Sequence, residues 1–244
     1  MIDKLSINIS KVKARLAEAA QRAGRDPAEI TLVAVTKTQP VTVVEAAAAA
    51  GLVEFGENRI EEAAPKMAAT PAHLRWHMIG HVQSRKAREV VQAGFRLVHS
   101  VDSLKLAERL SRFAIEAGAR PQAILLECNV SGETSKAGFP VWDGPTQWEA
   151  LLPDLEKIVG ATGQSPLPGV TVHGLMTIAP IVPTPDAARP FFRRLRELRD
   201  YLKIHLPQGD WRELSMGMTD DFETAIAEGA TLVRVGRALF GERD

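Results

Sequence analysis

Short apolar runs alternate with longer helix-like stretches along almost the whole chain, and this alternation restricts the fold more than any other feature. The apolar runs predict strands, and the stretches between them predict helices. Parallel strands need crossover connections of about this length, so the series predicts a parallel sheet covered by helices. The predicted strands are ITLVAVT, LVEFG, LRWHMIG, FRLVHS, AILLECNV, VTVHGLMTI, WRELSMG and TLVRVG. The predicted helices cover residues 42–50, 59–67, 85–93, 104–117, 148–159, 188–205 and 222–227, and RALFG forms a short helical turn.

Eight strands in 244 residues match the number and length that close a (β/α)8 barrel. A doubly wound open sheet uses the same local pattern, but no G-x-G-x-x-G turn follows the first strand. An amphipathic helix over residues 4–23 precedes the series. We therefore predict an α/β fold with one domain over residues 1–244, a single (β/α)8 TIM-type barrel with an extra N-terminal helix.

The charge balance and the apolar segments limit the partners of the chain. Thirty basic and thirty acidic side chains cancel, so we expect neither nucleic acid nor an anionic membrane surface as a partner. No segment resembles a signal peptide or reaches the length that spans a bilayer, and we expect a cytoplasmic protein. The single cysteine, Cys128, lies in an apolar run, which predicts a core residue in a reducing compartment.

The carboxyl ends of the predicted strands are where a barrel of this kind carries its active site. Lys37 stands just past the first strand, between two threonines and before Gln39-Pro40. Such a lysine is either a solvated loop charge or a functional amine. His77 and His81 are four residues apart, but they flank a Gly80 turn and lack the helical H-E-x-x-H pattern, so we predict no metal site.

Small residues and a hydroxyl follow the last two strands. Loops after strands seven and eight of such barrels often hold phosphate, and helix N-termini favour anions. The alternative is that these are ordinary turn glycines. Strand eight pairs with strand one in a closed barrel, so a phosphorylated aldehyde held there could reach Lys37 and form a Schiff base. Pyridoxal 5′-phosphate and a sugar phosphate both fit this description. The predicted phosphate cradle consists of Ser215, Met216, Gly217, Gly236 and Arg237.

Seven sequence segments follow one another along nearly the whole chain: VAVTKTQP, FGENR, WHMIGHVQSRK, NVSGETSKAGF, HGLMTIAP, SMGMTDDFETAI and VRVGRALFG. Together they resemble the pyridoxal phosphate homeostasis proteins. The resemblance implies a barrel similar to the N-terminal domain of bacterial alanine racemases and eukaryotic ornithine decarboxylases, without their second, β-rich domain. It also implies site residues: Lys37 as the Schiff-base lysine, Ser215, Gly236 and Arg237 at the phosphate, Arg234 at the pyridine nitrogen, and Asn58, His81 and Met176 along the pocket.

The implied place of Arg234 has a chemical consequence. Arginine is effectively always protonated, so it disfavours a protonated pyridine nitrogen and makes the cofactor a weaker electron sink. Arg85 departs from the family pattern, which has asparagine there, and this leaves the role of that side chain undefined. Lys136 matches a family lysine considered as a relay or a secondary cofactor site.

The leading hypothesis is a carrier or regulator of pyridoxal 5′-phosphate that acts in intracellular cofactor homeostasis without robust turnover. A two-base racemase needs a second proton-transfer group, often a tyrosine, and the one tyrosine, Tyr201, falls in a predicted helix far from the strand ends. The alternatives are an amino-acid racemase with another second base, and a Schiff-base aldolase acting on a sugar phosphate. We expect a monomer, with PLP-dependent apoenzymes as recipients of the cofactor.

Overall fold

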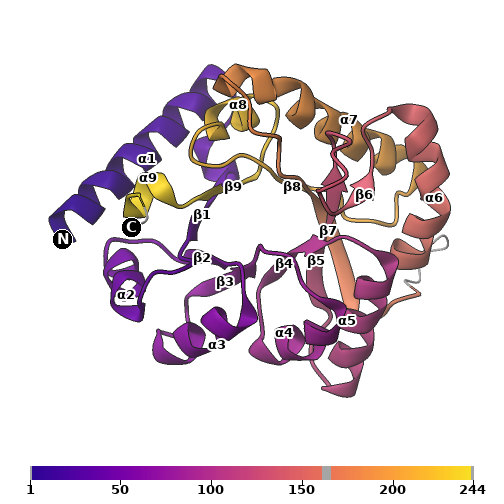
Figure 1. Ribbon diagram of the computed structural model, residues 1–244, viewed down its shortest axis with the longest axis horizontal. Coiled ribbons are helices and arrows are strands. Elements are labelled where there is room, and N and C mark those ends of the chain that lie inside the picture. The colour runs from indigo at the N-terminus through magenta and orange to yellow at the C-terminus, as the bar shows by residue number, and fades with distance from the viewer. Residues whose placement is uncertain (1, 161–165, 243–244) are drawn as a thin grey trace.

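The computed structural model describes residues 2–160 and 166–242, and Figure 1 shows strands at the centre of the molecule with helices around them. Strands and helices alternate along the chain as the sequence predicts. The strands are β1 (Thr31–Val35), β2 (Glu54–Glu57), β3 (Arg75–Met78), β4 (Leu97–Val101), β5 (Gln122–Asn129), β6 (Phe139–Pro140), β7 (Val170–Met176), β8 (Glu213–Ser215) and β9 (Leu232–Val235). The helices are α1 (Ile2–Arg22), α2 (Val41–Ala49), α3 (Ile60–Ala69), α4 (Ala87–Ala93), α5 (Leu104–Glu116), α6 (Pro145–Val159), α7 (Arg189–His205), α8 (Phe222–Ala227) and α9 (Arg237–Phe240).

Eight of the nine strands in the described ranges form a closed parallel barrel. The hydrogen-bonded order runs β4-β3-β2-β1-β9-β8-β7-β5, and the pairing of β4 with β5 closes the ring. β1 lies between β2 and β9, with Val33 opposite Arg234. The predicted single barrel is confirmed, and so is the adjacency of the first and last strands on which the sequence argument about Lys37 depends.

The N-terminal helix α1 covers the side of the barrel that α9 is too short to cover. Its apolar stripe includes the buried side chains of Val12 and Leu16. Arg15 pairs with Glu223 of α8 at 2.9 Å, and Asn8 donates to the backbone oxygen of Leu239 in α9 at 3.0 Å. Figure 1 shows α1 beside α8 and α9. The extra N-terminal helix therefore completes the outer ring.

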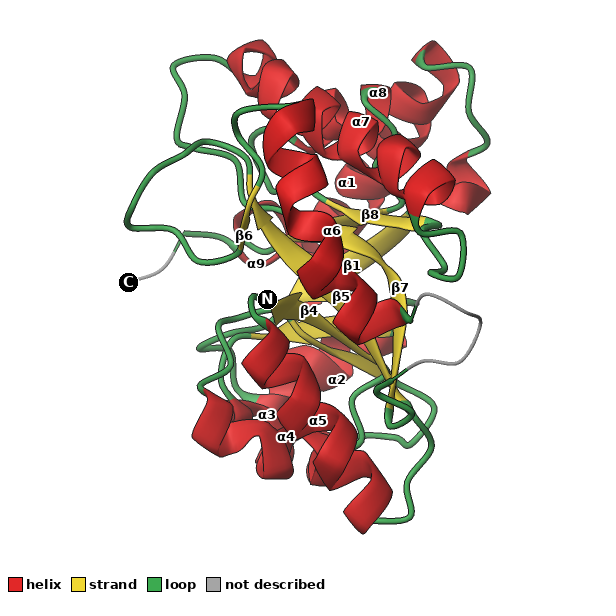
Figure 2. Ribbon diagram, turned by 90° about the vertical axis from the view of Figure 1, so that its right-hand side faces the viewer, coloured by secondary structure: helices red, strands yellow, loops and turns green. Residues whose placement is uncertain are grey.

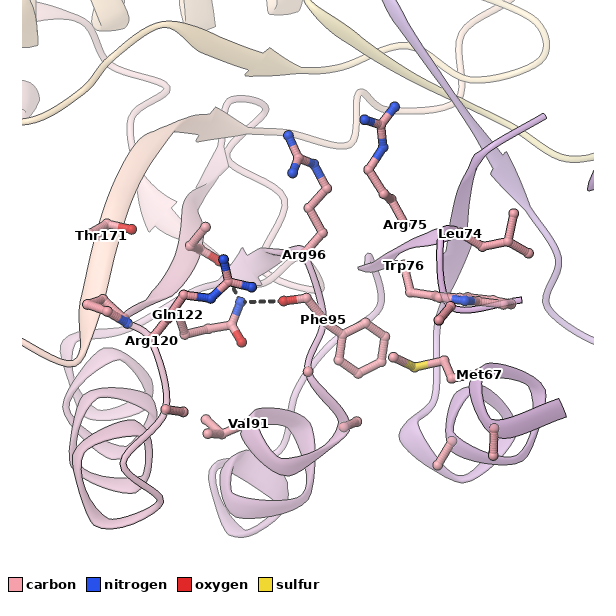
Figure 3. Close-up of a pocket in the computed structure, with 18 of the residues that line it drawn as sticks. Met67, Leu74, Arg75, Trp76, Val91, Phe95, Arg96, Arg120, Gln122 and Thr171 are labelled. Atoms are coloured by element: carbon pink, nitrogen blue, oxygen red, sulfur yellow. Dashed lines mark hydrogen bonds between the residues drawn. The ribbon is translucent and has the colours of Figure 1, made fainter. Parts of the chain in front are cut away.

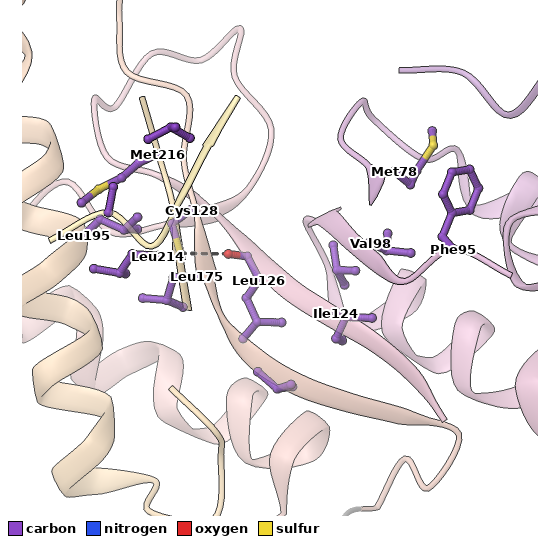
Figure 4. Packing of buried hydrophobic residues seen from close by; sticks show 14 of the residues in the cluster. Met78, Phe95, Val98, Ile124, Leu126, Cys128, Leu175, Leu195, Leu214 and Met216 are labelled. Carbon is purple, nitrogen blue, oxygen red and sulfur yellow. Dashed lines mark hydrogen bonds between the residues drawn. The ribbon is translucent and has the colours of Figure 1, made fainter. Parts of the chain in front are cut away.

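Two separate apolar clusters hold the strands. The larger one lies between the strands and the helices, and Figure 4 shows part of it, including Leu126, Leu195 and Leu214. The smaller one draws its buried residues from strands alone and fills the middle of the barrel; it consists of Val33, Leu97, Leu125, Met176 and Leu232. Figure 2 shows the strands enclosed by helices on opposite sides. We call these two clusters the outer layer and the inner cluster.

Several details differ from the sequence prediction. α6 begins at Pro145, before the predicted start at residue 148, because a proline fits the first turn of a helix, where its missing N–H has no intrahelical partner. The short strand β6 was not predicted, since two residues give no periodicity. Cys128 is buried and unpaired, as predicted.

Candidate functional site

Lys37 lies in a tight turn directly after β1. The N–H of Gln39 donates to the oxygen of Thr36 at 2.9 Å and closes the turn. Thr38 has a φ of 67°, in the left-handed region that a β-branched residue rarely occupies. Its N–H donates to Oε2 of Glu62 at 2.9 Å, which helps to hold this conformation. The structure therefore fixes the backbone around the lysine at a cost in local strain.

A buried ion pair between β2 and α3 supports this turn. Lys66 of α3 contacts Oε1 of Glu57 at 2.6 Å and donates to the backbone oxygen of Thr36 at 2.8 Å. The hydroxyl of Thr36 donates to the same oxygen of Glu57 at 2.7 Å. The sequence does not reveal this pair, because the pattern of helix α3 does not show which strand Lys66 faces.

Arg234 lies inside the barrel on β9 with 4% of its surface exposed. Its Nη1 donates to the hydroxyl of Ser215 at 2.6 Å and its Nη2 to the oxygen of Thr177 at 2.9 Å. Burial lowers the pKa of Arg234 to about 10, and the charges of Glu127 and Asp221 oppose this shift, so the guanidinium stays protonated at neutral pH. The site thus contains a permanent buried cation whose orientation is fixed.

The hydroxyl of Ser215 also belongs to a chain of polar side chains that runs through the barrel. It lies 2.8 Å from Nδ1 of His99, and Nε2 of His99 lies 2.8 Å from Nδ1 of His77. Nε2 of His77 in turn lies 2.9 Å from Oε2 of Glu54 at the start of β2. All of these side chains are buried. Burial lowers the pKa of His99 well below its ordinary value, with further contributions from His77 and Arg234, which keeps this imidazole neutral.

Acidic side chains lie near Arg234 toward the carboxyl ends of β4 and β5. Burial raises the pKa of Glu127 to about 7, and the charge of Asp102 adds to the shift, whereas Arg234 and His81 oppose it. Oδ2 of Asp102 pairs with Nδ1 of His81 at 3.1 Å. The predicted residue His81 is exposed and lies at this edge of the barrel. Glu127 was missed, although strand alternation places it on the same face as Asn129.

The loops after β8 and β9 contain the predicted phosphate cradle. The N–H of Arg234 donates to the oxygen of Gly217 at 3.0 Å, which joins the loop after β8 to β9. Gly217 has a φ of 91°, and a Cβ there would come within 2.6 Å of Ala225. Met216 packs in the outer layer, as Figure 4 shows, and its N–H donates to Leu232. Gly236 caps α9.

Arg237, next to Gly236, is exposed and forms an ion pair with Asp220. The structure thus brings Gly217, Gly236 and Arg237 to one side of the barrel mouth. It gives the hydroxyl of Ser215 protein partners, His99 and Arg234, inside the barrel. Any contact of Ser215 with a phosphate would therefore involve its backbone and not its hydroxyl.

The remaining predicted residues lie at different depths. Met176 is fully buried in the inner cluster, so it forms part of the packing beneath the mouth. Asn58 and His81 line a pocket of about 520 Å³ together with Arg85, between the loops after β2 and β3. Lys136 pairs with Glu133 at 2.6 Å and donates to the oxygen of Ile178.

A larger cavity, of about 870 Å³, opens at the opposite end of the barrel. Figure 3 shows Arg75, Arg96 and Arg120 around it, with Gln122 donating to the oxygen of Phe95. None of the predicted site residues lines this cavity. We place the candidate site at the carboxyl ends of the strands instead, because the buried arginine, the strained turn and the shifted carboxyl are there.

The donor set of this site suits an anionic aromatic aldehyde better than a metal ion. No cluster of three or more His, Cys, Asp or Glu that could hold a metal occurs among residues 2–160 and 166–242. A primary amine, a fixed guanidinium and two loops with glycines can together hold a carbonyl, a ring nitrogen and a phosphate. Within the same residues, no helix is long and apolar enough to cross a membrane.

A family model and a curated relative each match nearly the whole chain. A family model described as "Alanine racemase, N-terminal domain" matches residues 7–244. The pyridoxal phosphate homeostasis protein of Pseudomonas aeruginosa is 47% identical over 238 residues, which cover 97% of this chain and 95% of that protein.

Two solved structures share this fold, one with high and one with low sequence identity to the chain. The PipY protein of Synechococcus elongatus, solved with PLP bound, is 40% identical, with a TM-score of 0.75, covering 94% of this chain and 100% of that one. Alanine racemase from Corynebacterium glutamicum shares the fold at 17% identity, with a TM-score of 0.68, covering 99% of this chain and 62% of that one.

Proposed function

Because this chain belongs to the family of pyridoxal phosphate homeostasis proteins, we propose that it binds pyridoxal 5′-phosphate reversibly and takes part in intracellular cofactor homeostasis. Lys37 holds the aldehyde as a Schiff base, and Arg234 faces the ring nitrogen. Gly217, Gly236 and Arg237 hold the phosphate, with the backbone of Ser215 and Met216. Asn58 and His81 line the edge of the site, and Met176 packs beneath it.

The observation that carries this proposal is the buried Arg234. Its guanidinium is held by Ser215 and Thr177, and some of its N–H donors are not committed to either. Pyridoxal phosphate supplies an aldehyde that condenses with amines and a ring that withdraws electrons most strongly when its nitrogen is protonated. A permanent cation beside that nitrogen opposes its protonation. The site therefore suits retention of the cofactor better than turnover of an amino acid.

The position of the one tyrosine also argues against a two-base racemase. Tyr201 of α7 stacks on His205, with ring centroids 3.8 Å apart, and contacts Trp148 of α6 at 5.6 Å. It lies on the outside of the barrel and is remote from the carboxyl ends of the strands. We propose that the protein is a monomeric cytoplasmic carrier that passes PLP to apoenzymes.

One observation favours a racemase as a second candidate. Glu127 has a pKa of about 7 and lies near Arg234, and a carboxyl with such a pKa can exchange protons at neutral pH. An aldolase that uses Lys37 on a sugar phosphate without PLP is the third candidate. Borohydride trapping of a sugar phosphate in the absence of PLP would favour it.

The test uses the purified protein with added PLP, and compares Lys37→Ala with Lys86→Ala, which changes a lysine near the mouth that pairs with Glu61. We expect a visible absorption band for the wild type and for Lys86→Ala, but not for Lys37→Ala. Alanine and serine should not racemise at enzyme-like rates. A band that survives in Lys37→Ala contradicts the Schiff base, and rapid racemisation contradicts the carrier.

A further inference from the structure

We infer that Glu54, His77 and His99 are positioning residues for Arg234. With Ser215 they form a hydrogen-bond chain through the barrel, which we call the relay, and the relay holds the guanidinium in place at the cofactor end. The part of the inference that concerns cofactor binding rests on the proposed function. The hydrogen-bond direction and the structure of the relay do not depend on the proposed function.

With both histidines neutral, the relay has one direction, because Glu54 at its far end can only accept. A guanidinium only donates, so the hydroxyl oxygen of Ser215 accepts from Arg234, and the serine proton is left to donate to Nδ1 of a neutral His99. A carboxylate only accepts, so Nε2 of His77 donates to Glu54.

The two histidines can connect these ends with every donor matched to an acceptor. Nδ1 of His99 accepts from Ser215, so a neutral His99 carries its proton on Nε2 and donates it to Nδ1 of His77. Each neutral ring then has one donor and one acceptor in use. Both histidines are therefore expected as Nε2–H tautomers, and every proton in the relay points from Arg234 toward Glu54.

The neutral state of His99 matters for Arg234. A protonated His99 would donate to Ser215, so the serine oxygen would have two donors and a second positive charge would lie close to the guanidinium. Full burial of His99 disfavours this state. The relay thereby keeps the Ser215 oxygen available as an acceptor for Arg234.

The far end of the relay is anchored by a second ion pair. Oε1 of Glu54 contacts Nε of Arg75 at 2.6 Å, and the side chain of Arg75 is 47% exposed. Glu54 thus connects the amino-terminal end of the barrel to the cofactor end through buried groups. The packing of the barrel does not require polar residues here, because the neighbouring inner cluster of Val33, Leu97 and Leu232 is apolar. A positioning role explains why the relay is polar along its whole length.

The first experiment tests the relay without cofactor. Nitrogen NMR of the imidazole side chains reports the tautomer of each histidine. In the wild type we expect His77 and His99 as neutral Nε2–H tautomers. In Ser215→Ala, the Nδ1 signal of His99 should shift because it loses its donor. Ser111→Ala is the matched control, since Ser111 is a buried hydroxyl that accepts from the N–H of Gly169 outside the relay. An Nδ1–H tautomer at either histidine in the wild type overturns the relay.

The second experiment measures PLP retention and the visible spectrum of Glu54→Gln, a change at the end of the relay remote from the cofactor. We expect about tenfold weaker retention and a shifted absorption band, because a disturbed buried hydrogen bond reorients Ser215 and Arg234. His99→Gln, whose amide can still donate and accept, should retain more cofactor than His99→Leu. Unchanged retention and spectrum in Glu54→Gln, with clear changes in Arg234→Ala, overturn the positioning role. Absence of PLP binding in the wild type would instead refute the proposed function, and the tautomers would still test the relay.

Discussion

On their outer faces the barrel strands carry residues such as Leu126 and Leu214, which pack against helices in a continuous apolar layer. The inner faces differ: in β5 Glu127 follows Leu126, and in β9 Arg234 stands between two buried valines. The outer layer determines how the strands and helices assemble. The inner face of the strands carries the charged groups of the site that we propose for the cofactor. Because successive side chains of a strand point to opposite faces, the residues that pack against the helices alternate with the residues that face the site.

The buried pair of Glu57 and Lys66 is an exception to this division. It is a charged pair on the outer side of the barrel, between β2 and α3, and it contacts the turn that holds Lys37. Lys66→Met leaves the carboxylate of Glu57 buried without its cation. We expect the free energy of unfolding to fall by about 3–5 kcal/mol, measured by urea denaturation. PLP retention should fall as well, because the oxygen of Thr36 loses the lysine as a donor. Normal retention in a folded Lys66→Met protein would show that the pair is purely structural.

Leu214→Ala tests the outer layer alone. Leu214 is fully buried in β8, so the truncation should lower the free energy of unfolding by about 2–5 kcal/mol. The visible spectrum of the PLP complex should match that of the wild type, since the side chain faces the helices. A shifted band would contradict the division between the two faces of the strands.

Glu127→Gln tests the inner face through pH. Burial raises the pKa of Glu127 in the folded protein from 4.5 to about 7, so the folded state binds this proton more tightly than the unfolded state. Stability from this group is present below pH 4.5 and is lost as pH rises to about 7. The variant does not titrate, so its stability relative to the wild type should grow by on the order of 2–3 kcal/mol between pH 4.5 and 8. Parallel pH profiles of unfolding would refute the raised pKa.

Thr38→Asn should have the smallest effect. Asparagine adopts the left-handed conformation of this position more readily than threonine does, so we expect a gain of about 1 kcal/mol in the free energy of unfolding. Thr42→Asn, at an exposed position in α2, is the control. A loss of stability in Thr38→Asn would mean that the threonine is not strained.

The sequence predicts the barrel well, because the number and order of its strands follow from hydrophobic periodicity alone. It also places Lys37 beside β9, since the ends of a closed barrel must meet. It does not predict that His77 bonds to Glu54, because such a contact depends on the stagger between strands. His77 and His99 both lie within the barrel, where a contact between them cannot be read from the sequence. Alternation along β5 could have identified Glu127, but not its pKa, which depends on burial and on Asp102.

The attachment of the cofactor to Lys37, in the turn after β1, is the central claim, and covalent mapping tests it most directly. The protein is loaded with PLP, reduced with borohydride, digested and analysed by mass spectrometry. We predict one pyridoxyl adduct, on Lys37, in the wild type, and none at this position in Lys37→Ala. A principal adduct on another lysine, such as Lys136, would contradict the account.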